Sequence, residues 1–345
     1  MLVARAVRPL CGDLRSAGPA AGAGWSFAGH ALSSLLMEQR YVGRTGLRVS
    51  RLGLGTMTWG RDTDEHEAAE QLRELLDAGG SLVDVGTAYG AGACEEVLGK
   101  LLGSVASRDD IVICAKAAVP IYRTGPDVSR RALLSALDAS LTRLGVDHVD
   151  LWTVPGWSSR VPLEETLSAL SVAVETGRAR YAGIANVTGW QAALAATSAV
   201  RAGSPVAVQA EYSLVQRRIE AELVPAAAHL GLGVIAWSPL GRGVLTGKYR
   251  YGTPADSRAA SPHLAAFVEP YLDRTARRIV DAVITAADGL GCAPLEVALA
   301  WVRDRPGVSS VLVGARTAAQ LRGSLASEDV QLPVEILAAL DEVSL

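Results

Sequence analysis

The sequence predicts an α/β protein in which eight parallel strands close into a (β/α)8 barrel. Eight short apolar runs recur between residues 51 and 315, and longer helical patterns separate them. The runs are apolar throughout instead of alternating, which is typical of parallel strands covered by helices on their outer face. Eight strand–helix units in one chain fit a closed barrel. The expected strands are 51–56, 81–85, 111–116, 148–154, 180–186, 207–213, 233–239 and 309–315.

A short hairpin is expected before the first barrel strand. Residues 41–49 read YVGRTGLRV, with two apolar-flanked segments around Gly43 and Gly46. Glycines between two such segments are a hairpin signal.

The helical segments carry recognisable ends. Residues 64–79 start at Asp64, an N-cap residue, and stop at Gly79, a C-cap residue. Leucines recur near one face of 129–145, which ends at Gly145.

An open doubly wound sheet is the main rival fold. It usually carries GxGxxG after its first strand, and GLGTMTWG lacks that spacing.

The first 36 residues differ in composition from the rest and contain a single acid, Asp13. A transit peptide has this composition. So does a stretch upstream of a true start at Met37, which is the interpretation we favour. In either case we expect residues 1–36 to be disordered and residues 37–345 to form one barrel domain.

Bulk composition excludes several classes of protein. The net charge is −3 and no dense Lys/Arg cluster occurs, which argues against a nucleic-acid partner. No apolar run approaches the ~18 residues of a membrane span. The four cysteines show neither CxxC nor metal-ligand spacing, which favours reduced thiols in a cytoplasmic protein without a metal site. The oligomeric state is not determined by these features.

The longest interruption of the strand–helix pattern is 240–270, which is rich in Gly, Pro and Ser. It follows the seventh strand, so in a barrel it lies on the C-terminal face, where active sites are built. A loop of this length without regular structure is usually functional or disordered.

Three polar residues near the ends of strands two and three suggest chemistry. Asp84 lies near the end of strand two, Tyr89 follows in the next loop, and Lys116 ends strand three. A lysine at the end of an apolar strand needs a carboxylate partner, which Asp84 supplies. A cation beside a phenol lowers the tyrosine pKa, so Tyr89 can act as a general acid toward a carbonyl oxygen. Reduction of that carbonyl needs a nicotinamide, because side chains carry no hydride donor.

Five motifs in this order resemble those of the aldo-keto reductase superfamily, and the resemblance covers residues 41 to 344. Within that superfamily, the segment from strand seven into the loop after it most resembles the bacterial and potassium-channel β-subunit-like branches. The motifs are GLGTMTWG (53–60), DVGTAYGAGACEEVLGKLL (84–102), DASLTRLGVDHVDLW (138–152), WSPLGRGVLTGKY (237–249) and VLVGARTAAQL (311–321).

The resemblance implies NADPH lying extended across the barrel mouth and a small carbonyl substrate beside it. Trp237 would stack on the nicotinamide, and Asn186 and Gln209 would hold its carboxamide. The remaining implied cofactor contacts are Gly55, Thr56, Met57 and Asp84 near the nicotinamide, the backbone from Ser238 through Leu240 and Gly241 to Gly243 at the pyrophosphate, Lys248 and Arg258 at the phosphates, and Gly314, Arg316 and Gln320 at the adenosine end, with Arg316 the candidate for the 2′-phosphate.

Several positions depart from the family pattern. Ala185 stands where a serine precedes Asn186, and Gly323 and Ser324 stand where an acid and an asparagine usually contact adenine. We therefore expect NADPH to bind more weakly than is usual in the family.

The largest departure is Pro155. The family completes Asp84, Tyr89 and Lys116 with a histidine at the end of strand four. Counting forward from Asp150 and back from Pro162 both lead to Pro155. Losing one preorganised donor typically costs ~10²–10³ in rate. His263, in the loop after strand seven, is the one other histidine that could reach the mouth, and Trp157 is expected to form an apolar wall with Trp59 and Val119.

Two functions remain open from the sequence. The first is an NADPH-dependent carbonyl reductase in which Tyr89 is the acid, with weak activity. The second is a cofactor-binding redox sensor or regulatory protein with little turnover, which Pro155 favours. A metal-dependent barrel hydrolase would need His or carboxylate clusters at strand ends, and the sequence shows none.

Overall fold

A computed structural model describes residues 37–117, 121–122, 125–198, 203–255, 257–262 and 264–345. The expectations for residues 1–36, for Val119 and for His263 lie outside these ranges. The following account concerns the unit Leu36–Leu345, from its first described residue onward.

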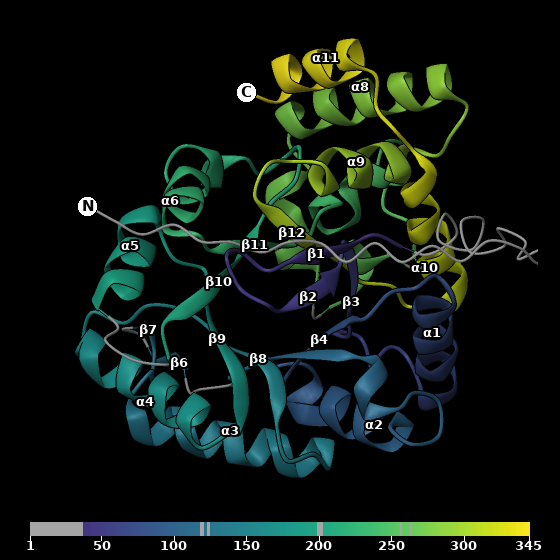
Figure 1. The fold of residues 1–345 in the computed structure, drawn as a ribbon. Coiled ribbons are helices and arrows are strands. Elements are labelled where there is room, and N and C mark those ends of the chain that lie inside the picture. The colour runs from purple at the N-terminus through teal and green to yellow at the C-terminus, as the bar shows by residue number, and fades with distance from the viewer. Residues whose placement is uncertain (1–36, 118–120, 123–124, 199–202, 256, 263) are drawn as a thin grey trace, which may run out of the picture. The chain divides into compact units, whose positions relative to one another are not determined.

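The eight predicted strands form a closed parallel barrel, as expected (Figure 1). Each strand pairs with the next barrel strand in the chain, and the last, β12, pairs with the first, β3. The strands are β3 (Leu52–Gly55), β4 (Leu82–Gly86), β5 (Val112–Lys116), β8 (Val149–Val154), β9 (Ala179–Ala185), β10 (Pro205–Glu211), β11 (Gly233–Trp237) and β12 (Val308–Val313).

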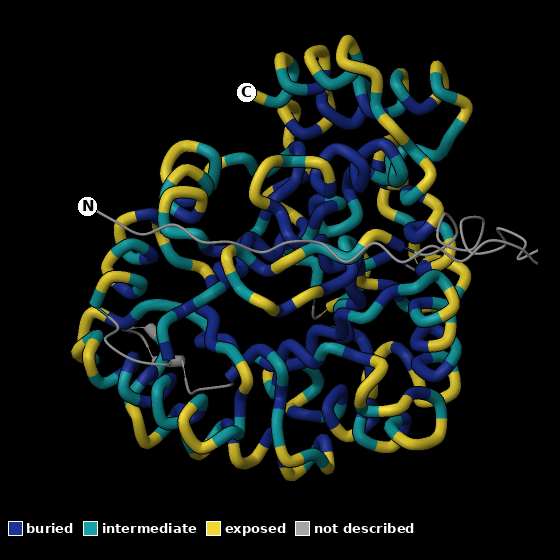
Figure 2. Tube along the Cα trace, viewed as in Figure 1, coloured by how far each residue is buried: buried dark blue, intermediate teal, exposed yellow. Residues whose placement is uncertain are grey.

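Helices surround the barrel and bury one face against the strands or against other helices (Figure 2). Asp64 caps the first helix by accepting a hydrogen bond from the Glu67 amide, as predicted, and Gly145 ends the third at φ 66°. Ala78, not Gly79, is the C-cap of the first helix. The helices are α1 (Glu65–Asp77), α2 (Ala93–Leu101), α3 (Arg130–Leu144), α4 (Leu163–Glu175), α5 (Gly189–Ser198), α6 (Leu223–Leu230), α7 (Ala265–Val268), α8 (Arg274–Leu290), α9 (Pro294–Arg303), α10 (Ala318–Leu325) and α11 (Val334–Ser344).

The predicted hairpin is present as β1 (Gln39–Tyr41) and β2 (Arg48–Ser50), which pair antiparallel. Val42, Leu47 and Val49 from this hairpin share a buried cluster with inward-facing side chains of the barrel strands, among them Leu82 and Leu151. A second, shorter antiparallel pair, β6 (Ile121–Tyr122) with β7 (Gly125–Pro126), follows β5. The hairpin thus closes the barrel at the end where the strands begin, and the opposite end is left for the site.

The segment after β11 contains more regular structure than the sequence suggested. Its described residues form the short helical turns η4 (Gly241–Thr246), η5 (Arg258–Ala260) and η6 (Glu269–Tyr271), together with α7. Two residues inside η4, Arg242 and Gly243, have left-handed φ values of 60° and 96°. Glycine adopts this conformation without penalty, whereas arginine needs tertiary contacts to hold it there.

No single helix in the described part of the chain is both long and apolar enough to cross a membrane. Helices α8 and α9 are long and apolar enough only when they are taken together, and a bend of 100° separates them.

Candidate active site

The structure brings Asp84, Tyr89 and Lys116 together at the carboxyl ends of β4 and β5. Lys116 Nζ lies 3.0 Å from Asp84 Oδ2 and 3.3 Å from Asp84 Oδ1. The Tyr89 hydroxyl donates to Asp84 Oδ2 at 3.3 Å, and Lys116 Nζ lies 5.1 Å from the centre of the Tyr89 ring. Asp84 is buried, with 2% of its surface exposed, so its charge depends on these partners.

Gln209 on β10 completes this cluster. Its Oε1 accepts a hydrogen bond from Lys116 Nζ at 2.8 Å, and its Nε2 donates to Asp84 Oδ1 at 2.7 Å. The sequence resemblance assigned Gln209 to the cofactor carboxamide alone. Its contacts with the ion pair depend on β10 lying across the barrel from β4, which sequence spacing does not reveal.

The electrostatics of Tyr89 differ from the expectation. Burial raises the pKa of Tyr89 above its ordinary value, and the Asp84 carboxylate adds to this, so the opposing effect of Lys116 is outweighed. The predicted lowering of the Tyr89 pKa is therefore wrong for this structure. Burial opposes the charge of Lys116, but Asp84 and then Tyr89 raise its pKa above the ordinary value. Below pH 10 the cluster thus holds a neutral phenol and a charged ammonium.

A buried ion pair anchors the loop that carries Tyr89. Glu95 at the start of α2 is fully buried, and Arg143 of α3 donates to its Oε2 at 2.7 Å through Nε. Arg143 Nη2 also donates to Thr87 Oγ1 at 2.7 Å, two residues before Tyr89. These contacts join the loop between β4 and α2 to the third helix.

Replacing Arg143 with methionine should lower the free energy of unfolding by about 3–5 kcal/mol, because it leaves the Glu95 charge buried without its cationic partner. Urea unfolding followed by circular dichroism measures this change. As a control, Arg178→Met removes the exposed pair with Asp138 and should cost less than ~1 kcal/mol. Equal losses in the two variants would contradict the special role of Arg143.

Pro155 directly follows β8, at the position predicted from the counting argument. It offers no side-chain donor, and its carbonyl accepts a hydrogen bond from Asn186 Nδ2 at 3.1 Å. Asn186 has φ 56°, and its Oδ1 accepts from the Trp237 indole at 3.2 Å. The described histidines do not replace the missing donor: His66 is on α1, His229 on α6, and His148 precedes β8, where it contacts Arg180.

The expected apolar wall is not formed as predicted by the residues that the structure describes. Trp59 is fully buried, and its indole donates to Gln71 Oε1 at 2.8 Å. Trp157 packs edge-on against Trp190 of α5, with ring centres 5.5 Å apart, and it does not line the cavity described next. Trp157 therefore packs against a tertiary partner on α5, whereas it was expected to form a substrate wall.

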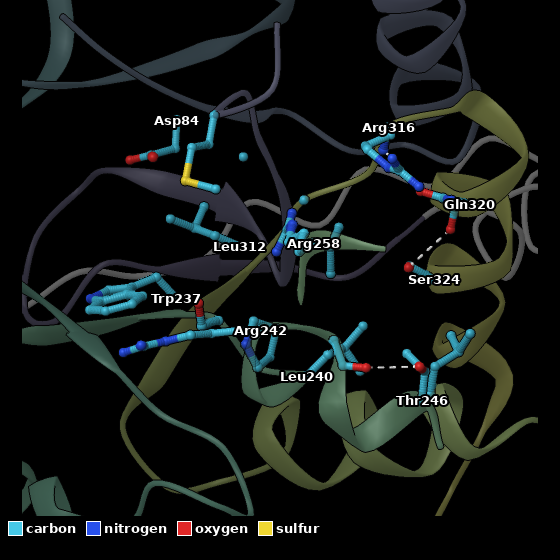
Figure 3. A pocket seen from close by; sticks show the side chains of 18 of the residues that line it. Asp84, Trp237, Leu240, Arg242, Thr246, Arg258, Leu312, Arg316, Gln320 and Ser324 are labelled. Carbon is cyan, nitrogen blue, oxygen red and sulfur yellow. Dashed lines mark hydrogen bonds between the residues drawn. The ribbon is translucent and has the colours of Figure 1, made fainter. Parts of the chain in front are cut away.

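A cavity of about 600 Å³ extends from the Asp84–Lys116 pair to α10. Figure 3 shows Asp84 and Trp237 at one end, Arg316 and Gln320 at the other, and Arg258 between them. The cavity is lined by these predicted residues: Gly55, Met57, Asp84, Tyr89, Lys116, Asn186, Gln209, Trp237, Ser238, Leu240, Gly243, Lys248, Arg258, Gly314, Arg316 and Gln320.

Two predicted cofactor contacts do not line the cavity. Thr56 is buried and donates through Oγ1 to the Asp84 carbonyl at 2.8 Å, so it supports the strand end instead. Gly241 is buried in η4, and its amide donates to the Ser238 carbonyl at 2.9 Å. Gly243 lines the cavity, but its amide donates to the Leu240 carbonyl at 3.0 Å. The amides of both glycines are thus used within the loop that the pyrophosphate was expected to contact.

Arg242 is a cavity residue that the sequence reasoning missed. It forms a bidentate ion pair with Glu211 at the end of β10: Nε donates to Oε1 at 2.8 Å and Nη2 to Oε2 at 2.7 Å. Its guanidinium carbon lies 3.8 Å from the centre of the Phe267 ring. These contacts hold η4 against the barrel and explain how Arg242 keeps a left-handed φ. Its position between two glycines was the available signal in the sequence.

Cations gather in the half of the cavity farther from Asp84. Among the described residues, Arg258 forms no ion pair, and burial followed by the charge of nearby Arg316 lowers its pKa. A Cβ at Gly314 would lie 3.3 Å from Arg258 Nη2, and one at Gly243 would lie 3.2 Å from Lys248 Nζ. Glycine at these positions lets the cations line the cavity closely, an arrangement that fits the phosphates of a dinucleotide.

Within the described ranges, no three His, Cys, Asp or Glu side chains are grouped as metal ligands would be.

Comparison with known proteins gives consistent matches. A sequence profile described as the Aldo/keto reductase family matches residues 51–345. The chain is 37% identical over 320 residues to "Uncharacterized oxidoreductase YrpG" of Bacillus subtilis (strain 168), covering 89% of this chain and 96% of that protein. It is 33% identical over 325 residues to a "Probable voltage-gated potassium channel subunit beta" of Arabidopsis thaliana, covering 89% and 95%. A protein of the same description from Oryza sativa subsp. japonica is 34% identical over 310 residues, covering 85% and 92%.

Proposed function

Because the chain belongs to the aldo/keto reductase family, we propose that it uses NADPH to reduce a small aldehyde or ketone. The observation that carries this proposal is the arrangement of one cavity: a phenol and an Asp–Lys pair at one end, with Lys248, Arg258 and Arg316 lining the remainder. The unpaired cysteines of the described chain, Cys94, Cys114 and Cys292, favour a reducing compartment such as the cytoplasm.

The residues of the cavity fit NADPH in an extended pose. When bound, its nicotinamide supplies the hydride that no side chain can supply. Lys248 and Arg258 would hold the phosphates, and Arg316 the 2′-phosphate. Trp237 offers a flat apolar face to the nicotinamide, and its ring is fixed by the hydrogen bond to Asn186.

Tyr89 would donate the proton that the carbonyl oxygen needs. Its raised pKa keeps the phenol protonated through the physiological range, and the nearby Lys116 charge favours the phenolate that remains after donation. Asp84 holds Lys116 in place through contacts at 3.0 and 3.3 Å. Pro155 provides no second donor, so we propose that the rate is low for the family.

Substitutions of two arginines should show which phosphate of the cofactor each arginine contacts, when the affinities for NADPH and NADH are compared. Arg316→Gln should weaken NADPH binding by about 10-fold or more and leave NADH binding unchanged, because one charge-assisted contact with the 2′-phosphate is worth roughly 1.5–3 kcal/mol. Arg258→Gln should weaken both, because both cofactors carry the pyrophosphate. Titration of the reduced nicotinamide fluorescence measures all four affinities. An Arg316→Gln variant that loses both cofactors equally would contradict the 2′-phosphate assignment.

A cofactor-binding regulatory protein is the second candidate, and Pro155 is the observation that favours it. The similarity to proteins described as potassium channel β subunits fits the same interpretation. Single-turnover oxidation of bound NADPH by a panel of aldehydes and ketones distinguishes the two functions. Oxidation with any member of the panel supports the reductase, whereas tight NADPH binding without oxidation supports the regulatory protein.

A further inference from the structure

The hydroxyl groups at the α10 end of the cavity are bonded within the protein. Ser324 Oγ donates to the Gln320 carbonyl at 3.1 Å, and Thr246 Oγ1 donates to the Gly243 carbonyl at 2.8 Å (Figure 3). A hydroxyl carries one hydrogen, so in this arrangement neither group has a donor left for a ligand. Ser324 is also buried, which limits the space in which its side chain can turn.

The side-chain amide of Gln320 is partly in use as well. Its Oε1 accepts a hydrogen bond from the Arg316 amide at 3.0 Å. Its Nε2 can donate to a ring acceptor such as N7, which adenine and guanine share. Gln320 is exposed, so water competes for such a contact. A bond of this kind does not distinguish one purine from another.

Gly323 leaves open space one turn beyond Gln320 on α10. It lines the cavity, and a Cβ at this position would lie more than 4 Å from the other parts of the described chain. Leu295 and Ala319 add apolar surface to the cavity wall. Contacts with the flat face of a base are tolerant of its identity, because every base has such a face.

We propose that this end of the cavity holds the purine of the dinucleotide without hydrogen-bonding to positions 1 and 6 of its ring, and that Gly323 leaves room for a substituent there. The inference rests on the proposed binding of NADPH with its adenosine at this end. Positions 1 and 6 lie on the edge of the purine that is remote from the sugar. With the sugar at Arg316, this edge points along α10 toward Gly323.

Two analogues of NADP⁺ test the recognition of this edge. In the hypoxanthine analogue an oxygen replaces the amino group at position 6 and N1 carries a hydrogen, so donor and acceptor exchange places. In the 1,N6-etheno analogue a fused ring covers both positions. Calorimetric titration of the wild type should give affinities for both analogues within about threefold of that for NADP⁺, because no protein partner of this edge is lost.

The opposite result is equally clear. A site that hydrogen-bonds to a group of its ligand rejects analogues lacking that group, because its own buried polar atoms are then left unpaired. A preference of more than about threefold for NADP⁺ over either analogue therefore overturns the proposal. Ser324→Ala removes the oxygen that could still accept from the amino group, and it should leave both preferences unchanged. A changed preference in this variant also overturns the proposal.

Gly323→Leu fills the open space and tests its position. The preference for NADP⁺ over the etheno analogue should rise by about tenfold, because the leucine and the fused ring compete for one volume. Gly323→Ala is the matched control, since its Cβ leaves the space open. Gly289→Leu makes the same change at an open glycine of α8 that does not line the cavity, and it should change none of the affinities. An unchanged preference in Gly323→Leu, or an equal rise in a control, overturns the proposal.

The oxidised dinucleotides separate this inference from the proposed reductase, because their binding is measured without turnover. A protein that binds all three with similar affinity but oxidises no NADPH refutes the reductase and supports the inference. A protein that prefers NADP⁺ and oxidises NADPH refutes the inference alone. A protein that binds none of the three overturns both.

Discussion

Replacing Tyr89 with phenylalanine should lower the single-turnover rate of NADPH oxidation by about 10²–10⁴-fold, the range typical of general acid catalysis. Among the described residues that line the Asp84–Lys116 end of the cavity, Tyr89 carries the neutral hydroxyl that the proposed mechanism uses as its acid. Burial and Asp84 raise its pKa, so it is protonated when the carbonyl arrives. The ring that remains in the variant fills the same space, so NADPH affinity should change by less than ~3-fold, because only a buried hydroxyl is lost.

The matched control for this prediction is Tyr251→Phe, because Tyr251 is 91% exposed and lies outside the cavity of the ion pair. Stopped-flow fluorescence of bound NADPH measures the rate with each variant. If Tyr89→Phe reduces carbonyls at the wild-type rate, the acid is another group, and the mechanism proposed here is wrong.

Replacing Pro155 with histidine should raise the same rate by about 10²–10³-fold, because it restores a hydrogen-bond donor to the developing oxyanion. Pro155 follows β8, one strand away from Lys116 at the end of β5. The contact of Asn186 with residue 155 uses the backbone carbonyl at 3.1 Å, which any residue retains. The substitution therefore adds a donor and leaves that contact in place.

Pro155→Ala is the control for backbone effects, since it removes the ring without adding a side-chain donor. The rate of the alanine variant should stay within ~3-fold of the wild-type rate. A substitution that adds no preorganised donor leaves the stabilisation of the oxyanion unchanged. An unchanged or lower rate with histidine, or an equal gain with alanine, would show that the end of β8 has been rebuilt for another purpose.

Much of the fold could be predicted because local patterns and barrel topology agree. All eight apolar runs became barrel strands, Asp64 caps the start of α1, and Gly145 caps the end of α3, as the sequence indicated. The segment after β11 was only partly predicted. Its short turns around Arg242 depend on an ion pair with Glu211, thirty-one residues earlier in the chain, and no local pattern encodes that contact.

The sequence by itself determined the class of fold, the strand ends that carry Asp84, Tyr89 and Lys116, and the proline at the end of β8. These follow from periodicity and spacing, which are local properties of a chain. Only the tertiary structure decided which side chains of the site contact one another. It joined Gln209 to the ion pair, turned Trp157 toward Trp190, and raised the pKa of Tyr89 where the neighbouring lysine alone suggested the opposite. The reason is physical: burial and contacts across the barrel depend on which strands face one another in space, and a change of solvation can outweigh a single nearby charge.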